Sequence, residues 1–150
     1  MVLVSNFFLR LPTFWLTGLA FWHVVAVLFG APFIESFLST AAFGACLSLF
    51  TFAPAAVIFE SWEQLSRLIF DRSPRTAGEK RILQIGVCSV VGAWLGAFPI
   101  PLDWDRWWQV WPISCLFGIA FGASASLVWL TFDHFSSSVR RASRPKWKIV

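Results

Sequence analysis

A segment rich in proline and tryptophan, residues 92–115, limits the folds open to this chain more than any other feature. It contains Pro99, Pro101 and Pro112, and a long apolar run flanks it on either side. Each proline lacks a backbone N–H, so the segment cannot cross hydrocarbon as a regular helix. Tryptophan rings favour the boundary between lipid and water. The segment therefore predicts a turn at a membrane surface between two helices.

The overall composition indicates an integral membrane protein. Of the 150 residues, 57% are hydrophobic and only 13% are charged, whereas a soluble domain carries about 25% charged residues. The mean hydropathy of +0.69 agrees with this. Three cysteines lie within or beside apolar stretches, where we expect free thiols used for packing.

Four apolar segments stand out, at about residues 11–31, 36–59, 82–98 and 111–132. A helix needs about 20 residues to cross the hydrocarbon core of a bilayer. The pattern predicts one all-α domain over residues 1–150, a polytopic bundle of four transmembrane helices. A basic tail, residues 133–150, follows the last span. The third segment is the shortest of the four.

The positive charges predict the orientation. Eleven of the twelve Lys and Arg residues lie at the amino end, in the loop 60–81 or in the tail, and only Arg106 lies elsewhere. Basic residues accumulate on the cytoplasmic side of membrane proteins. Both termini and the loop 60–81 are therefore expected in the cytoplasm. Because these residues flank the spans, we expect them to set topology and expect no nucleic-acid partner.

The loop 60–81 contains a candidate short helix. Trp62, Leu65 and Ile69 recur at helical spacing, and Glu63 stands four residues before Arg67. This segment either lies as a separate helix in the membrane interface or continues the second span into water.

Small residues predict where helices touch. Gly92 and Gly96 share one face of the third span, and Gly118 and Gly122 share one face of the fourth. Helices in lipid associate by close packing through such residues. We expect these glycines to join the third and fourth spans; contact with the helix of a partner is the alternative.

Two ionisable residues lie in or near the first two spans. His23 is expected near the middle of the first span, as a neutral side chain hydrogen-bonded to a neighbouring helix or as a functional group. Glu35 is expected in the turn that follows Gly30.

The charges of the Trp-rich segment have two interpretations. Asp103, Asp105 and Arg106 either hold a lipid headgroup or a partner's loop, or form a local turn in which carboxylates satisfy backbone donors and pair with the arginine. The tryptophans around them form either an interfacial belt or a sugar-binding platform. They are Trp104, Trp107, Trp108 and Trp111.

The sequence offers no set of residues for catalysis. Its two histidines, His23 and His134, are expected at different levels of the membrane, and no common nucleophile, zinc or phosphate-loop motif occurs. We therefore expect neither enzyme activity of its own nor a metal or other cofactor.

Residues 92–115 closely resemble the signature segment of the PIG-F family of glycosylphosphatidylinositol-anchor biosynthesis. A second segment, residues 23–35, is also similar to that family. Two departures are that Trp107 stands where the family has proline, and that the family has about two further spans before the first matching one. The matching residues of the signature are Trp94, Pro99, Pro101, Asp103, Trp104, Asp105, Arg106, Trp108, Gln109, Trp111 and Pro112.

The resemblance implies a non-catalytic, multi-pass subunit in the endoplasmic reticulum membrane that binds and stabilises ethanolamine-phosphate transferases. The matching residues of the signature are then candidates for contact with that partner or with lipid headgroups. Lys146 and Lys148 resemble a cytosolic dilysine retrieval signal. The alternative is a small lipid or solute carrier that uses His23 and the carboxylates of the Trp-rich segment.

Overall fold

The computed structural model describes residues 2–59, 61–71, 74–102 and 104–142. Over these residues it contains five α-helices, one 3₁₀-helix and no strand, so the all-α prediction is confirmed. The elements, in chain order, are α1 (Val2–Leu28), α2 (Phe37–Ile58), α3 (Trp62–Asp71), α4 (Ala77–Ala97), η1 (Trp107–Gln109) and α5 (Ile113–Ala142).

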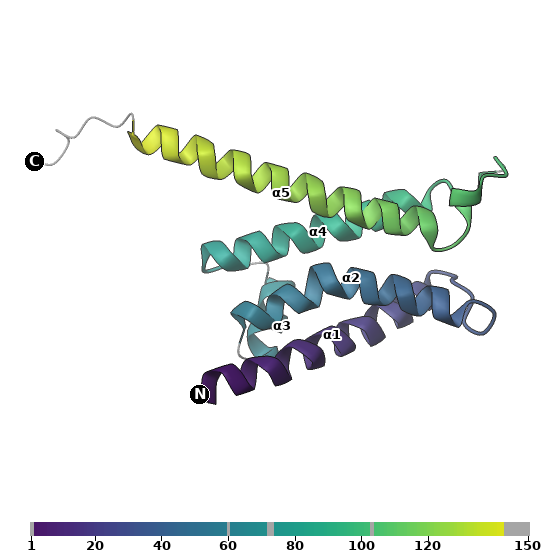
Figure 1. Ribbon diagram of the computed structural model, residues 1–150, viewed down its shortest axis with the longest axis horizontal. Coiled ribbons are helices and arrows are strands. Elements are labelled where there is room, and N and C mark those ends of the chain that lie inside the picture. Colours follow the sequence, from purple (N-terminus) through teal and green to yellow (C-terminus); the bar gives the residue numbers. More distant parts are fainter. Residues whose placement is uncertain (1, 60, 72–73, 103, 143–150) are drawn as a thin grey trace, which may run out of the picture.

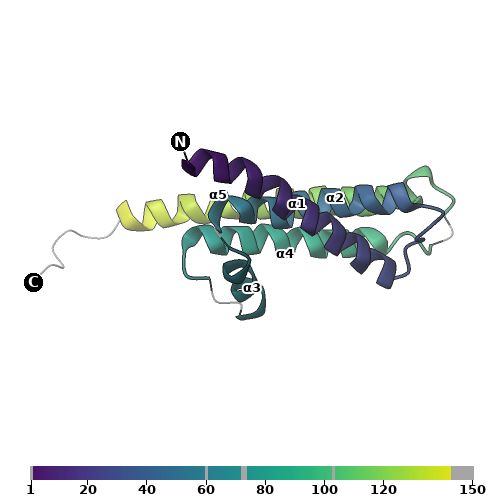
Figure 2. The same ribbon diagram turned by 90° about the horizontal axis from the view of Figure 1, so that it is seen from below.

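The long helices form two hairpins that lie side by side. α1 pairs with α2, α4 pairs with α5, and the inner helices α2 and α4 join the two pairs (Figure 1). The short helix α3 projects from one side of the bundle, near the end that carries the amino terminus (Figure 2). The loops that close the two hairpins lie together at the opposite end.

The ends of the helices follow from local hydrogen bonds. α1 ends at Leu28 because Gly30, with φ of 100°, allows the N–H of Ala31 to reach the carbonyl of Ala26 at 3.0 Å. α4 begins where the Thr76 hydroxyl accepts the N–H of Glu79 at 3.1 Å. α5 continues to Ala142, so residues 133–142, expected in the tail, are helical.

The segment after α2 is a separate helix. α2 ends at Ile58, Phe59 is extended with ψ of 134°, and α3 begins at Trp62. The alternative, a continuation of the second span into water, is therefore wrong. The chain turns because Phe59, 1% exposed, enters the core together with Leu65 and Leu68 of α3.

In the part of the chain that the structure describes, three helices contain stretches that are long and apolar enough to cross a membrane: Phe8–Leu28, Phe37–Ile58 and Ile113–Arg140. α4 lacks such a stretch because Glu79, Lys80 and Arg81 occupy its first turns. Its uncharged part, residues 82–97, is shorter than the roughly 20 residues that a bilayer requires.

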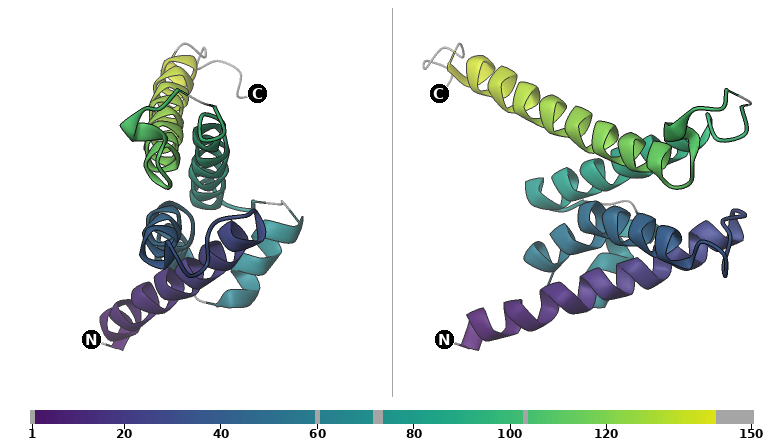
Figure 3. Two further views of the ribbon diagram at one scale, coloured as in Figure 1. Left: turned by 90° about the vertical axis from the view of Figure 1, so that its right-hand side faces the viewer. Right: turned by 45° about the vertical axis from the view of Figure 1, so that its right-hand side comes forward.

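Two apolar clusters hold the bundle together. One joins α1, α2 and α3 around Phe14, Phe59 and Leu68. The other joins the hairpins through Leu47 of α2, Ala93 of α4 and Ile119 of α5. Seen from one end, the α4/α5 pair lies above the α1/α2 pair, and α3 lies to one side (Figure 3, left).

Candidate functional site

The loop between α4 and α5, residues 98–112, rests on a tightly packed pair of helices. A Cβ added to Gly92 would overlap the backbone carbonyl of Gly118, and one added to Gly122 would overlap the carbonyl of Cys88. A Cβ added to Gly96 would lie 2.9 Å from the Cα of Cys115. The structure thus brings the four glycines together, with backbone against backbone, directly beneath the loop.

One buried amide organises the loop. Gln109 is 8% exposed, and its Nε2 donates to the carbonyl of Pro99 at 2.7 Å and to the carbonyl of Leu102. Its Oε1 accepts the backbone N–H of Arg106 at 2.9 Å. The carbonyls of Pro99 and Leu102 also accept the backbone N–H groups of Leu102 and Trp104. The Gln109 side chain therefore adds a second bond to each carbonyl and satisfies the N–H of Arg106, which ties the two halves of the loop together.

Asp105 and Arg106, the charged residues of the loop that the structure describes, form no ion pair with each other. Asp105 is exposed and has a left-handed φ of 47°. The ion pair between Arg67 and Glu79 lies at the start of α4, at the other end of that helix from the loop. Asp103 lies outside the described residues. The backbone N–H of Arg106 bonds to Gln109, so the amide, rather than a carboxylate, satisfies the donor at this turn.

The tryptophans of the loop divide into two groups. Trp104 and Trp107 are 56% and 70% exposed, and Trp108 packs edge-on against Trp104 with ring centroids 6.0 Å apart. Trp111 is half-buried, and its Nε1 donates to the hydroxyl of Thr40 on α2 at 3.2 Å. Trp111 thus differs from the other three tryptophans, because it ties the loop to the other hairpin.

Thr40 connects the two loops at this end of the bundle. It is fully buried, accepts from Trp111, and donates to the carbonyl of Pro32 at 3.4 Å. The ring of Phe43, one turn along α2, lies 5.1 Å from the ring of Trp111. These contacts position the exposed tryptophans relative to both hairpins.

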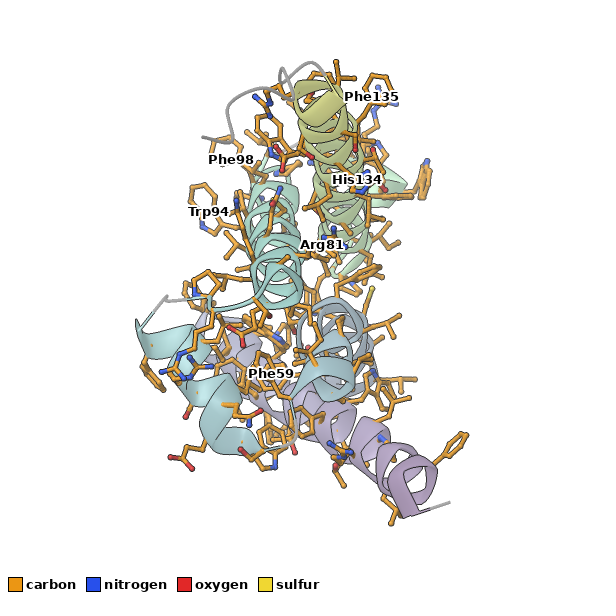
Figure 4. All side chains as sticks on the ribbon, turned by 90° about the vertical axis from the view of Figure 1, so that its left-hand side faces the viewer. Phe59, Arg81, Trp94, Phe98, His134 and Phe135 are labelled. Carbon is orange, nitrogen blue, oxygen red and sulfur yellow. The ribbon has the colours of Figure 1, made fainter. Side chains whose placement is uncertain are left out.

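An apolar surface on α4 continues toward the loop. Trp94 of α4 and Phe98, the residue that follows α4, are 67% and 69% exposed, and both project on the side away from α5 (Figure 4). Pro101 and Trp104 are also exposed. A surface of this kind suits lipid or the apolar face of a membrane partner.

His23 lies near the end of α1, rather than near the middle of the span as expected. It is 9% exposed, and its ring lies 4.9 Å from that of Phe37 and 6.2 Å from that of Phe33. Its Nε2 is buried and has no hydrogen-bond partner among the described residues. Glu35 is exposed in the turn after Gly30.

Three structural roles were not predicted: the bridge through Thr40, the amide of Gln109 and the close approach at Gly18. A Cβ added to Gly18 would lie 2.6 Å from the Phe52 ring. In the sequence, the only sign of the role of Thr40 is that a small polar residue interrupts an apolar run.

Lys146 and Lys148 lie outside the described residues. Among the described residues, no three His, Cys, Asp or Glu side chains are grouped to hold a metal.

Comparisons with known proteins identify relatives of this chain. The human protein named "GPI ethanolamine phosphate transferase, stabilizing subunit" is 45% identical over 122 residues, 81% of this chain and 56% of the human protein. The mouse protein of the same name is 48% identical over 107 residues, 71% of this chain and 49% of its own length. A fission-yeast (Schizosaccharomyces pombe) "PIGF/3-ketodihydrosphingosine reductase fusion protein" is 41% identical over 106 residues, 69% of this chain and 21% of the fusion.

This chain thus spans about half the length of the mammalian relatives that it matches. No solved structure matches it. The family model described as "GPI biosynthesis protein family Pig-F" matches residues 3–130, which include both hairpins and the loop built around Gln109. The chain belongs to the GPI biosynthesis protein family Pig-F.

Proposed function

We propose that this chain is a non-catalytic membrane subunit that binds and stabilises ethanolamine-phosphate transferases in glycosylphosphatidylinositol-anchor biosynthesis. The observation that carries the proposal is its similarity, over 81% of its length, to a human protein named as such a stabilising subunit. The arrangement of the loop agrees with a binding role, since its ordered residues present exposed tryptophans on a buried framework.

The contact surface in this proposal is the loop 98–112 together with Trp94 of α4. Exposed tryptophan and arginine side chains dominate the binding energy of many protein interfaces. Trp104, Arg106 and Trp107 are exposed, while Gln109 and Trp111 hold the backbone beneath them. A surface that is already ordered loses little conformational entropy when it binds.

The topology in this proposal has four spans, with α4 as the third crossing helix, α5 as the fourth, and both termini in the cytoplasm. A short apolar stretch can cross where neighbouring helices shield it or where the bilayer is locally thin. The close contact of α4 with α5 supports this. The chain then resides in the endoplasmic reticulum membrane, with Lys146 and Lys148 as the retrieval signal.

Co-purification tests the proposal. The tagged full chain is expressed in cells lacking their own family member and is recovered in mild detergent with its bound transferase. Replacing Trp104 and Arg106 together by alanine is expected to lower recovery of the transferase about tenfold, as for loss of an interface hot spot. The control is Lys80→Ala, an exposed residue at the opposite end of the bundle. Recovery that both variants leave unchanged would contradict the loop as the contact surface.

One observation favours the carrier alternative: His23 has a buried nitrogen without a partner among the described residues. Polar groups inside a membrane are functional candidates. The test is transfer of fluorescent lipid by the purified chain alone in vesicles. Transfer that His23→Phe abolishes would support a carrier, and no transfer above empty vesicles would reject it.

A further inference from the structure

A groove lies beside α3, at the end of the bundle opposite the Trp-rich loop. It has a volume of about 670 Å³, and its lining includes Arg67, Arg75, Glu63, Ser66 and Phe70. Two arginines and one exposed glutamate line it, and Glu79 contacts both arginines from the side of α4. Lys80, exposed in the first turns of α4, adds to the positive potential nearby.

Arg67 has hydrogen-bonding capacity that the protein leaves unused. Its Nη2 forms an ion pair with Oε1 of Glu79 at 3.5 Å. Its Nη1 is buried and has no hydrogen-bond partner among the described residues. A guanidinium presents five N–H donors, and leaving a buried charged donor without an acceptor is unfavourable. Arg67 also lines the groove, so this unused donor belongs to a side chain in the groove wall.

Glu79 contacts both arginines of the groove and leaves most of their side-chain N–H donors unused. Its Oε2 accepts the backbone N–H of Arg75 at 2.7 Å, while its Oε1 faces Arg67. The Arg75 side chain is itself exposed at the groove. Two guanidinium groups on one concave surface suit the oxygens of a phosphate group, which accept several charge-assisted bonds at once.

The position of the groove relative to the membrane favours a phosphate group that belongs to a lipid. It begins just beyond Ile58, the end of an apolar helix long enough to cross a membrane. Leu65 and Leu68 of α3 are buried against the bundle, whereas Phe70 is 83% exposed beside the arginines. This combination of an apolar exposed ring and basic side chains is typical of helices in the headgroup layer.

We propose that the groove binds the phosphate group of an anionic phospholipid on the side of the membrane where α3 lies. The two arginines contact the phosphate, and Phe70 contacts the acyl chains. This site is separate from the Trp-rich loop, and it does not depend on a transferase partner.

Native mass spectrometry of the full chain in mild detergent tests the proposal. Phosphatidic acid is the probe, phosphatidylcholine is the reference lipid, and inorganic phosphate is the soluble competitor. Arg75→Gln removes one guanidinium but keeps the backbone N–H that Glu79 uses. It is expected to weaken phosphatidic acid binding about tenfold, as for loss of a charge-assisted hydrogen bond. Lys80→Gln removes the same charge outside the lining and is the matched control.

The proposal is supported if phosphatidic acid is retained over phosphatidylcholine and if Arg75→Gln alone weakens that retention. Equal losses in both variants would show a diffuse charge effect and overturn it. Retention that Arg75→Gln does not change would also overturn it. Displacement by inorganic phosphate at the lipid's own concentration would show a soluble-phosphate site and reject the lipid as occupant.

Discussion

The two hairpins differ in the contacts that join their helices, although Gly44 of α2 also lies close to the backbone of α1. In the α1/α2 hairpin, side chains bond across the interface: Trp15 Nε1 reaches the carbonyl of Ala45 at 3.2 Å, and the Ser48 hydroxyl reaches the carbonyl of Trp15 at 2.7 Å. Trp22 Nε1 also reaches the Thr51 hydroxyl at 2.9 Å. In the α4/α5 hairpin, the glycines at 92, 96, 118 and 122 allow backbone to touch backbone.

The buried serines show the same contrast. Ser48 of α2 donates to the opposite helix, whereas Ser89 of α4 and Ser126 of α5 donate to carbonyls of their own helices. All three side chains are almost fully buried. A buried serine thus forms a hydrogen bond between two helices in one hairpin. In the other hairpin the buried serines form hydrogen bonds only within their own helix. The hairpins should therefore respond differently to the same substitutions.

The largest effect is expected for Gly92→Ala. The added Cβ would overlap the carbonyl of Gly118, and a helix backbone cannot move aside as a flexible side chain can. We expect a loss of at least about 2 kcal/mol in the free energy of unfolding, as for overpacking of a tight core. Thermal unfolding of the purified chain in detergent, followed by circular dichroism, measures it.

Gly86→Ala on the same helix is the matched control. A Cβ there would lie 3.6 Å from Thr51, an ordinary contact. Since alanine favours helix over glycine, this variant should be neutral or more stable by up to about 1 kcal/mol. If Gly92→Ala were tolerated as well as Gly86→Ala, close backbone packing would not hold α4 and α5 together.

The second effect concerns the loops that close the hairpins. The α1/α2 loop begins with a backbone conformation, the positive φ of Gly30, whereas the α4/α5 loop depends on hydrogen bonds of the Gln109 side chain. Gln109→Glu removes both donors and places a charge against the carbonyls of Pro99 and Leu102. We expect a loss of about 2 kcal/mol by the same unfolding measurement. Arg106→Ala keeps the backbone N–H and carbonyl that bond to Gln109, so it should change stability by less than about 0.5 kcal/mol.

The third effect is a difference in the stability lost when two buried serines, Ser48 and Ser89, are replaced by alanine. Ser48→Ala removes a hydrogen bond between helices and should cost about 0.6 kcal/mol, the average for such bonds in membranes. Ser89→Ala removes a bond within one helix and should cost less. If Ser89→Ala proved the more destabilising variant, the distinction between the two interfaces would be wrong.

The smallest effect is expected for Trp111→Phe. Phenylalanine keeps an aromatic ring beside Phe43 but loses the hydrogen bond to Thr40, so we expect a loss of about 0.5 kcal/mol. Trp107→Phe, at a position 70% exposed, should not change the unfolding temperature. Equal effects would argue against a bond between the two hairpins at this end.

The sequence predicted much of the fold because apolar runs and glycine spacing are local signals. The regions of the four long helices follow from hydropathy. Residues whose partners are distant in the chain could not be assigned in the same way. Trp111 and Thr40 are 71 positions apart, and only the packed bundle brings them together. Gln109 looked like one residue of a motif, and its role depends on where the prolines turn the chain.

Charges were harder to interpret than apolar residues. One interpretation of Asp103, Asp105 and Arg106 was a turn in which carboxylates satisfy backbone donors, yet the amide of Gln109 accepts the backbone N–H of Arg106. The first turns of α4 carry Glu79, Lys80 and Arg81, so hydropathy alone does not establish α4 as a span. Whether α4 crosses the membrane decides where both proposed sites lie.

Thiol labelling in sealed endoplasmic reticulum microsomes tests this crossing most directly. The native cysteines at 46, 88 and 115 are replaced by alanine, and single cysteines are introduced by Arg75→Cys and Trp107→Cys, both at exposed positions. If α4 crosses, a membrane-impermeant maleimide labels position 75 from outside and position 107 only after permeabilisation. Labelling of both positions from outside would place α3 and the Trp-rich loop on one face and contradict the four-span arrangement.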